Sequence, residues 1–294
     1  MNIPIAKTNL TDTEVNAVLE PLRSGWLVQG PKVREFEEKW SDFTGAKHSI
    51  AVTSCTSGLH LSLAASGFGQ DDEAIVPAFT WISTANVIEH LGGKVVFCDI
   101  NLDTFNIDVE QIESKITSKT KAILPVHLFG LSANMDPIIN LAKKHELLIV
   151  EDAACGFGSM YKSQHVGTFG DAGVYSYYST KAIFAGEGGV AVTNNEQIGS
   201  YLQDFIAYDR FKQKMPIGCN IRLSELQALM IYSVVNDYKK IISNKTEIGE
   251  RYEDACKSSQ INFISQKHNL NIGNFYKFTV ISPKEKVLDK YRQF

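Results

Sequence analysis

The chain has 294 residues, of which 44% are hydrophobic, so it can form a large buried core in one or two domains. Its net charge is −4, and acidic and basic residues are interspersed without a basic stripe. This balance argues against a nucleic-acid-binding protein and against a polybasic contact with a membrane.

The cysteines and the start of the chain indicate a compartment. The five cysteines are scattered, odd in number and lack a CxxC pair, so a disulfide framework and a zinc site are not favoured, and we expect no metal. The first twelve residues lack the basic and apolar regions of a signal peptide, and no apolar stretch approaches the ~20 residues of a membrane helix. We therefore expect a cytoplasmic protein with reduced thiols.

Two helices are predicted at the start of the chain. Thr11 and Glu14 have the spacing of a capping box, which opens a helix that continues to about Arg23. Gly25 follows and is expected to end this helix. A second helix is predicted over residues 31–43.

Short apolar segments then alternate with segments of helix length up to about residue 150. The apolar segments are continuous rather than alternating, as expected for strands that are buried on both faces. The predicted strands are 50–52, 74–76, 95–97, 122–124 and 148–150. The predicted helices are 56–66, 83–90, 108–115 and 136–144. This alternation predicts an α/β fold with a mostly parallel sheet between layers of helices.

The pattern changes after Gly189. The last clear strand of the series is 190–192. Further helices are predicted over 196–206, from about Ser224 through Tyr238, where apolar residues recur at helical spacing, and over 245–256, and a strand is expected over 275–281. We therefore expect a large α/β domain in residues 1–210 and a smaller α+β domain in residues 211–294.

The surroundings of one lysine indicate a cofactor. Lys181 follows the hydroxyl-rich segment 175–180, and the glycine-rich segment 186–189 comes next. Upstream, Asp152 lies at the end of an apolar run. A lysine amine forms a Schiff base with the aldehyde of pyridoxal phosphate, and an acid that keeps the pyridine nitrogen protonated makes the ring an electron sink. Each feature is weak alone, but together and in this order they predict pyridoxal phosphate.

Several ordered motifs resemble the DegT-type sugar aminotransferase family. This family belongs to the fold-type I pyridoxal-phosphate superfamily, which includes aspartate aminotransferase. The motifs are residues 80–86, 125–130, 151–154, 176–181 and 186–189. The resemblance extends from about residue 24 to about residue 227. It implies transfer of an amino group, usually from glutamate, to a keto group of a nucleotide-linked sugar in deoxyamino-sugar or surface-polysaccharide synthesis, although some members aminate cyclitols.

The resemblance implies roles for three residues around the cofactor ring. Lys181 would hold the cofactor covalently and then act as the general acid and base. Asp152 would lie opposite the pyridine nitrogen, and Trp81 would stack on the ring. The ordinary alternatives are a solvated surface lysine, an acid that caps a helix and a tryptophan in the core.

The resemblance also assigns residues to the cofactor phosphate. Thr56 and Ser57 begin a predicted helix, whose terminal amides attract a phosphate, and Ser176 would contribute to the same site. Serine and threonine before a helix also act as caps, and the two roles are compatible. Asn220 matches an asparagine that reaches the phosphate of the neighbouring subunit, which implies a homodimer with shared active sites. Its ordinary alternative is an asparagine in a loop before a helix.

The chain departs from the family pattern at several positions. Cys155 stands where the family commonly has a glutamine or histidine near the 3-oxygen of the cofactor, and a thiol is a weak donor. Residues 208–210 replace a common histidine–glycine pair. The chain ends at Phe294, whereas relatives usually continue, so the small domain is expected to be shorter than in the family, and the sequence leaves open whether the sugar-binding half of the site is complete. His127 matches a recurrent family histidine, and we favour a hydrogen-bonded structural role for it under the sheet.

Two alternatives to an aminotransferase remain. One is a sugar dehydratase of the same family, in which a histidine replaces the lysine, so Lys181 argues against it. The other is a truncated or non-catalytic relative that binds the cofactor without turnover. The sequence does not identify the nucleotide, the sugar or the ring carbon that is aminated.

Overall fold

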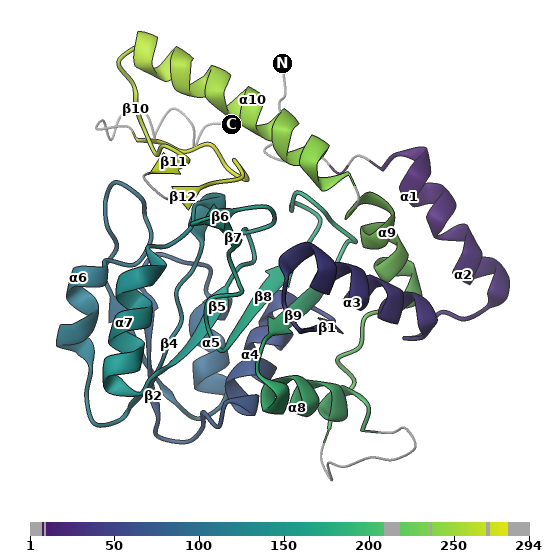
Figure 1. The fold of residues 1–294 in the computed structure, drawn as a ribbon, viewed down its shortest axis with the longest axis horizontal. Coiled ribbons are helices and arrows are strands. Elements are labelled where there is room, and N and C mark those ends of the chain that lie inside the picture. Colours follow the sequence, from purple (N-terminus) through teal and green to yellow (C-terminus); the bar gives the residue numbers. More distant parts are fainter. Residues whose placement is uncertain (1–7, 9, 209–217, 236, 269–270, 282–294) are drawn as a thin grey trace, which may run out of the picture.

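A seven-stranded sheet forms the centre of the computed structural model, which describes residues 8, 10–208, 218–235, 237–268 and 271–281 (Figure 1). Its strand order is β1-β9-β8-β5-β4-β2-β3. The strands are β1 (His48–Val52), β2 (Glu73–Pro77), β3 (Lys94–Cys98), β4 (Thr120–Ile123), β5 (Leu148–Asp152), β8 (Ala172–Ser176) and β9 (Gly189–Thr193). The four pairings among β3, β2, β4, β5 and β8 are parallel, which confirms the predicted α/β class.

Strand β9 is antiparallel to both of its neighbours, β1 and β8. A parallel connection needs a crossover, usually through a helix. The segment between β8 and β9, residues 177–188, contains no helix and returns the chain directly beside β8. The sequence analysis did not predict this reversal.

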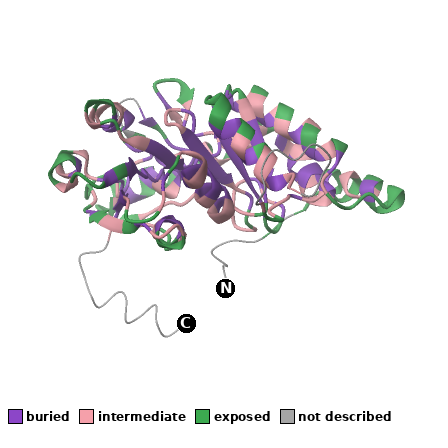
Figure 2. Cartoon of the chain, turned by 90° about the horizontal axis from the view of Figure 1, so that it is seen from below, coloured by how far each residue is buried: buried purple, intermediate pink, exposed green. Residues whose placement is uncertain are grey.

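Helices cover both faces of the sheet. They are α1 (Asp12–Ala17), α2 (Leu19–Ser24), α3 (Pro31–Thr44), α4 (Cys55–Ala65), α5 (Ser83–His90), α6 (Val109–Ile112), α7 (Met135–His145), α8 (Glu196–Ile206), α9 (Glu225–Val235) and α10 (Tyr238–Ser258). Side chains of α4, α5 and α8 form one core with the sheet, and those of α3, α9, α6 and α7 pack on the opposite face. Figure 2 shows the strands buried between these layers, with exposed residues on the outer sides of the helices.

The first predicted helix is two helices. Its capping box is present, since the Thr11 and Glu14 side chains each bond to the backbone of the other residue, and Gly25 ends α2 in the left-handed conformation. Pro21 has no amide to donate to the carbonyl of Ala17, so the helical bonding is interrupted and α1 ends before Val18. The helix predicted at 108–115 is likewise short, because α6 passes into the 3₁₀ turn η1 (Glu113–Lys115).

Helix α9 is fixed onto the large layer by one buried carboxylate. Glu225 accepts hydrogen bonds from the amides of Gly30 at 2.9 Å, Lys32 at 3.0 Å and Val33 at 2.9 Å, at the start of α3. These amides have no partner within α3 itself, so the carboxylate satisfies them. Helix α10 begins at Tyr238, earlier than predicted. A domain boundary near residue 210 stays a prediction, because residues 209–217 lie outside the described part.

Short strands connect the last described segment to the large layer. A four-stranded sheet has the order β11 (Lys267–His268), β12 (Asn271–Ile272), β6 (Met160–Tyr161) and β7 (Gln164–His165). Strand β10 (Asn262–Phe263) pairs with β13 (Val280–Ile281), and these elements lie below α10 in Figure 1. The strand predicted over 275–281 is wrong before Val280, because the Tyr276 amide bonds to the Asn274 side chain and the Lys277 amide to the Phe129 carbonyl.

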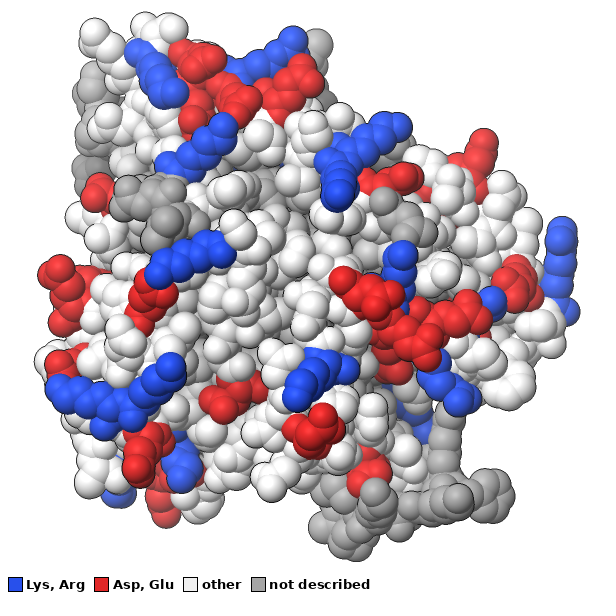
Figure 3. Space-filling view, viewed as in Figure 1, with Lys and Arg blue, Asp and Glu red and all other residues white. Residues whose placement is uncertain are grey.

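Charges of both signs are mixed on the face that Figure 3 shows. Opposite charges pair locally, as between Lys94 and Glu73 at 3.3 Å and between Lys32 and Glu35 at 3.1 Å. Such pairs at the surface contribute at most about 1 kcal/mol each. Within the described ranges, none of the helices has the length and apolar character that crossing a membrane requires.

Glu37 makes the stability of the fold depend on pH. Its carboxylate, half-buried on α3, accepts a hydrogen bond from the Ala51 amide of β1 at 2.8 Å. Burial raises the pKa of Glu37 from 4.5 to about 7. The folded protein therefore keeps a proton that the unfolded chain loses, so this group's contribution to stability falls as the pH rises from about 4.5 to about 7.

Glu37→Gln should remove this pH dependence. The amide oxygen of glutamine can still accept from Ala51, but it carries no charge. We expect the variant to be about 2 kcal/mol more stable than the parent at pH 8, with a smaller gain at pH 5. Urea unfolding at both pH values measures the difference. An equal gain at the two values would show that the buried charge of Glu37 is not the cause.

Candidate active site

The carboxyl ends of β5 and β8 bring the predicted site residues to one face of the sheet. Asp152 and Ser176 are the last residues of these two parallel strands. Alternate residues of a strand face the same side, so Asp152 lies on the face of Val150, and Ser176 on that of Val174. Val150 and Val174 belong to the core that α4 covers. Ligands of open α/β sheets bind outside this carboxyl edge.

Asp152 is a buried carboxylate held in a fixed orientation. Its side chain accepts hydrogen bonds from the Thr84 hydroxyl at 2.7 Å and from the Ala154 amide at 3.1 Å, and the residue is 5% exposed. No lysine or arginine of the described residues forms an ion pair with it. A buried carboxylate without a cation is costly, and a protonated pyridine nitrogen would supply the missing positive charge.

Lys181 lies in the connection between β8 and β9. The connection is closed by backbone hydrogen bonds, including that from the Lys181 amide to the Tyr178 carbonyl at 2.8 Å. The Lys181 amine donates to Cys155 Sγ at 3.3 Å and lies 4.6 Å from the centre of the Tyr276 ring. Burial lowers the pKa of the Lys181 amine, but Cys155, Tyr276 and Cys55 raise it, and the net direction is upward. The lysine amine thus lies near the edge where Asp152 ends β5, because its contact Cys155 comes three residues after Asp152.

The N-terminus of α4 forms a cradle of backbone amides beside this edge. Ser54 caps the helix by accepting from the Ser57 amide, and the Ser57 hydroxyl accepts from the Ser54 amide in return. The Ser57 side chain therefore serves the cap, whereas the Thr56 amide belongs to the first turn, where amides lack helical partners. Gly189 lets β9 pass close to this turn, because a Cβ there would lie 2.6 Å from the Ser54 carbonyl carbon. Free amides at a helix start suit a phosphate.

Two predicted site residues lie apart from this group in the described structure. Trp81 is 75% exposed in the segment between β2 and α5. Asn220 is exposed and accepts from Arg222 Nε at 3.2 Å, and the Arg222 backbone bridges Val52 at the end of β1. The structure thus brings together Lys181, Cys155 and Asp152, and it gives Trp81 and Asn220 no contact with them.

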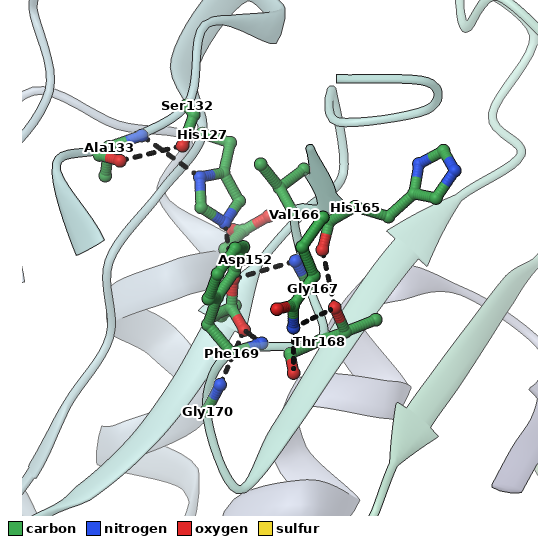
Figure 4. Close-up of polar contacts among 12 residues, drawn as sticks. His127, Ser132, Ala133, Asp152, His165, Val166, Gly167, Thr168, Phe169 and Gly170 are labelled. Atoms are coloured by element: carbon green, nitrogen blue, oxygen red, sulfur yellow. Dashed lines mark hydrogen bonds and ion pairs between the residues drawn. The ribbon is translucent and has the colours of Figure 1, made fainter. Parts of the chain in front are cut away.

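His127 and Glu151 form a buried network on the opposite face of the sheet (Figure 4). The Ala133 amide donates to His127 Nδ1 at 3.1 Å, so the ring proton is on Nε2, which donates to Glu151 at 2.8 Å. Glu151 also accepts from the amides of Gly167, Phe169 and Gly170 at 2.7 to 2.8 Å. His127 is the hydrogen-bonded structural histidine that the sequence favours.

The sequence profile of the DegT/DnrJ/EryC1/StrS aminotransferase family matches residues 8–293. The chain belongs to this family. The resemblance that the motifs predict is therefore confirmed.

Three curated relatives of this DegT-family chain illustrate the range of the similarity. An uncharacterized protein of Methanocaldococcus jannaschii is 43% identical over 201 residues, which are 68% of this chain and 52% of the relative. The spore coat polysaccharide biosynthesis protein SpsC of Bacillus subtilis is 37% identical, over 86% of this chain and 69% of its own. The GDP-perosamine synthase of Escherichia coli O157:H7 is 35% identical, over 95% and 77%. The chain thus spans about half of the archaeal relative.

Solved structures confirm the fold of this DegT-family member. The putative sugar aminotransferase Spr1654 of Streptococcus pneumoniae, in its PMP form, has a TM-score of 0.90 at 28% identity, over 96% of this chain and 78% of its own. The E. coli GDP-4-keto-6-deoxy-D-mannose-3-dehydratase with bound hydrated PLP also has a TM-score of 0.90, at 25% identity, over 99% and 83%. The prediction of a pyridoxal-phosphate family is confirmed. The overall fold does not separate amination from dehydration.

The DegT-family motifs left three residues of the site without a role. Thr84 orients Asp152 and lies inside the motif 80–86, so its hydroxyl was a usable signal. Tyr276 touches Lys181, and Asn274 bonds to the carbonyl of Cys155 at 2.7 Å. Nothing near Asn274 or Tyr276 in the sequence points to the site, because their approach depends on long-range contacts.

Proposed function

We propose that this chain is a pyridoxal-phosphate-dependent aminotransferase that aminates a keto group of a nucleotide-linked sugar, with glutamate as the donor. One observation carries the proposal: a half-buried lysine amine and a buried carboxylate, which forms no ion pair with a described lysine or arginine, both lie at the carboxyl edge of the sheet in a DegT-family chain. The names of the Bacillus and E. coli relatives support a role in the synthesis of a polysaccharide sugar.

The residues present fit pyridoxal phosphate. When bound, this cofactor supplies an aldehyde that takes up amino groups and a protonated ring that withdraws electrons. Asp152 holds the proton on the pyridine nitrogen, because no lysine or arginine of the described residues forms an ion pair with its carboxylate. Trp81 provides a flat apolar surface for the ring, and Cys155 contributes a small side chain beside it.

The phosphate is assigned to the start of α4. The amides of the first turn, at Cys55 and Thr56, donate toward the phosphate, with the Ser57 cap keeping the turn in place. Ser176 adds a hydroxyl from the end of β8. A phosphate at this position leaves the aldehyde end of the cofactor to Lys181.

Lys181 binds the cofactor and moves the proton. Its amine is the nucleophile. Once released, it is the base placed to take a proton from the donor's carbon in the first half-reaction and the acid placed to deliver a proton to the sugar's carbon in the second. The Cys155 thiol remains neutral, since burial raises its pKa. Its sulfur therefore accepts a hydrogen bond from the Lys181 amine without forming an ion pair. Lys181 also favours amination over dehydration.

A product assay tests the proposed reaction. The protein would be incubated with pyridoxal phosphate, glutamate and a panel of nucleotide-linked keto sugars, and mass spectrometry would follow 2-oxoglutarate and the amino sugar together. Equal amounts of the two products are expected with at least one sugar. Deoxy-keto products without 2-oxoglutarate would identify a dehydratase, and no turnover with bound cofactor would identify a non-catalytic relative.

The working unit in this proposal is a homodimer with shared active sites. Trp26, Leu27 and Val28 are exposed after Gly25, and Ile82 is exposed beside Trp81, although large apolar side chains are usually buried. A second copy of the chain that covers these residues would remove them from water. Asn220 is exposed as well, and its side-chain NH₂ group is a donor that would serve the phosphate bound by a partner.

Subunit mixing should reveal shared sites. Inactive Lys181→Ala would be mixed with Asn220→Asp, whose added carboxylate repels the partner's phosphate. If each site combines the Lys181 of one subunit with the Asn220 of the other, exchanged dimers contain one intact site. About a quarter of all sites should then be active after random exchange, as measured by turnover.

The matched control places both substitutions in one chain. Mixing this double variant with Lys181→Ala creates no intact site, so no activity should return. The shared site would be ruled out if the two single variants exchanged subunits and the mixture remained inactive. A fully active monomer would rule it out as well.

A further inference from the structure

The Lys181 amine has a second neighbour that comes from the last described segment of the chain. Its nitrogen lies 4.6 Å from the centre of the Tyr276 ring, within the range of a cation–π interaction. The other lysine–tyrosine contacts among the described residues join neighbours in sequence, such as Lys162 with Tyr161, and follow from chain connectivity. The contact of Lys181 with Tyr276 does not, so the fold creates it.

Tyr276 is held by hydrogen bonds at its hydroxyl and at its backbone amide. Its hydroxyl lies 3.0 Å from Thr180 Oγ1, the residue directly before Lys181. Its backbone amide donates to Asn274 Oδ1 at 2.8 Å. The position of the ring therefore depends on the loop that carries Lys181 and on the Asn274 side chain.

Asn274 connects this ring to the loop that carries Cys155. The Asn274 side-chain amide donates to the carbonyls of Cys155 at 2.7 Å and Phe157 at 2.8 Å, and the residue is fully buried. Its backbone amide donates to the Gly130 carbonyl at 3.2 Å, and a Cβ at Gly130 would overlap the Asn274 side chain. One asparagine thus sets the positions of both neighbours of the Lys181 amine, the sulfur and the ring.

The backbone between Asn274 and Tyr276 has an unusual conformation. Phe275 has a φ of +50°, in the left-handed region that a bulky residue rarely adopts. Its buried ring packs against Gly249 of α10, where a Cβ would overlap it. Such outliers persist only where the surroundings determine them, and they gather at functional sites. The packing of Phe275 turns the following residue toward Lys181.

We propose that Tyr276 is a positioning residue for Lys181, which holds the lysine amine at the cofactor position, and that Asn274 sets the place of the ring. A lysine side chain is flexible, and an amine that must attack and then move a proton gains from a restricted position. The face of an aromatic ring attracts the ammonium form without forming a salt bridge that the amine would have to break before it reacts. This inference rests on the proposed role of Lys181.

Among the described residues, the charged and titratable groups around the Lys181 amine are few. Cys155 and Cys55 lie on the side of the sheet, and burial raises the pKa of both thiols, so both are neutral near pH 7. Asp152 interacts with both thiols, and Lys277 places its ammonium 5.5 Å from the same Tyr276 ring. Cys155 and the Tyr276 ring are thus the two groups in contact with the Lys181 amine, and the ring is the one that Tyr276 variants remove while Cys155 stays in place.

Competitive acetylation of the cofactor-free protein tests the proposal. Trace labelling across pH, followed by peptide mass spectrometry, reports the pKa of the Lys181 amine without any turnover. In Tyr276→Leu the pKa should fall by about one unit, because leucine keeps the apolar bulk but loses the face of the ring. In Tyr276→Phe, which keeps the ring, the pKa should remain within a few tenths of the parent. Lys245, in the same digest, serves as the internal control and should not change.

The same variants have a second readout once the cofactor is bound. The pH midpoint of the cofactor's visible absorption should shift downward in Tyr276→Leu and remain unchanged in Tyr276→Phe. Asn274→Ala, which frees the ring, should shift both midpoints in the direction of Tyr276→Leu, provided that its thermal unfolding remains cooperative.

An unchanged Lys181 pKa in folded Tyr276→Leu would overturn the proposal, as would equal shifts in the leucine and phenylalanine variants. Failure of the proposed function looks different. It would appear as cofactor bound elsewhere, or as absent turnover, while the labelling of cofactor-free Lys181 still responded to the ring.

Discussion

Lys181→Ala should lower amino transfer by several orders of magnitude, because one substitution removes both the nucleophile and the group that moves the proton. The variant should bind pyridoxal phosphate only without a covalent bond. Borohydride reduction followed by digestion should fix the cofactor to Lys181 in the parent protein and to no residue of the variant. Turnover and peptide mass spectrometry measure the two effects.

Lys245 is the matched control for this prediction. It lies on α10, and burial lowers the pKa of its amine, which makes it a competitor for an aldehyde at neutral pH. Lys245→Ala should nevertheless keep the turnover and the absorbance of the parent. Cofactor trapped on Lys245 in the parent protein would refute the assignment of Lys181.

Asp152→Asn should leave the protein folded and weaken cofactor binding about 10- to 100-fold, the range for losing a hydrogen bond to a charged group. The asparagine oxygen can accept from the Ala154 amide, and its NH₂ group can donate to the Thr84 hydroxyl, which rotates to accept. The local hydrogen bonds thus survive, but the negative charge that holds the pyridinium proton is lost. Equilibrium titration with cofactor and the turnover rate report the loss.

Thr84→Val separates the orientation of the carboxylate from its charge. Valine removes the 2.7 Å hydrogen bond and leaves the carboxyl group in place, so we expect a smaller loss of affinity than in Asp152→Asn. If Asp152→Asn kept the affinity and turnover of the parent, the carboxylate would serve only the backbone turn at Ala154.

The strand–helix alternation could be predicted because each central strand is a buried apolar run. Residues 74–76 of β2, for example, are apolar and buried, so this segment shows no alternation of polar and apolar residues that could confuse the assignment. The direction of β9 was not predictable in the same way. It depends on how the connection 177–188 returns, and apolar runs read the same for parallel and antiparallel strands.

The residues of the site also differed in how far the sequence could predict them. Lys181 and Asp152 stand in local motifs, and the ends of β5 and β8 bring these motifs to one edge of the sheet. Tyr276 stands in a segment that was predicted as a strand, and its place follows from the bonds of Asn274 to a distant loop. The strand pattern of the sequence could not predict where Tyr276 lies, because Phe275 departs from the extended conformation that this pattern assumes.

The two adjacent acids at the end of β5 face opposite sides of the sheet and have different partners. Glu151 is enclosed by three amides and an imidazole on one face, whereas Asp152 opens toward the carboxyl edge on the other. Exchanging the two residues would keep the composition and the net charge of the chain. The shorter aspartate would then stand where four donors converge on a longer side chain, and the glutamate would extend one methylene further toward the carboxyl edge of the sheet. At this dipeptide the order of the two acids therefore matters to the structure, although the composition and the net charge do not depend on it.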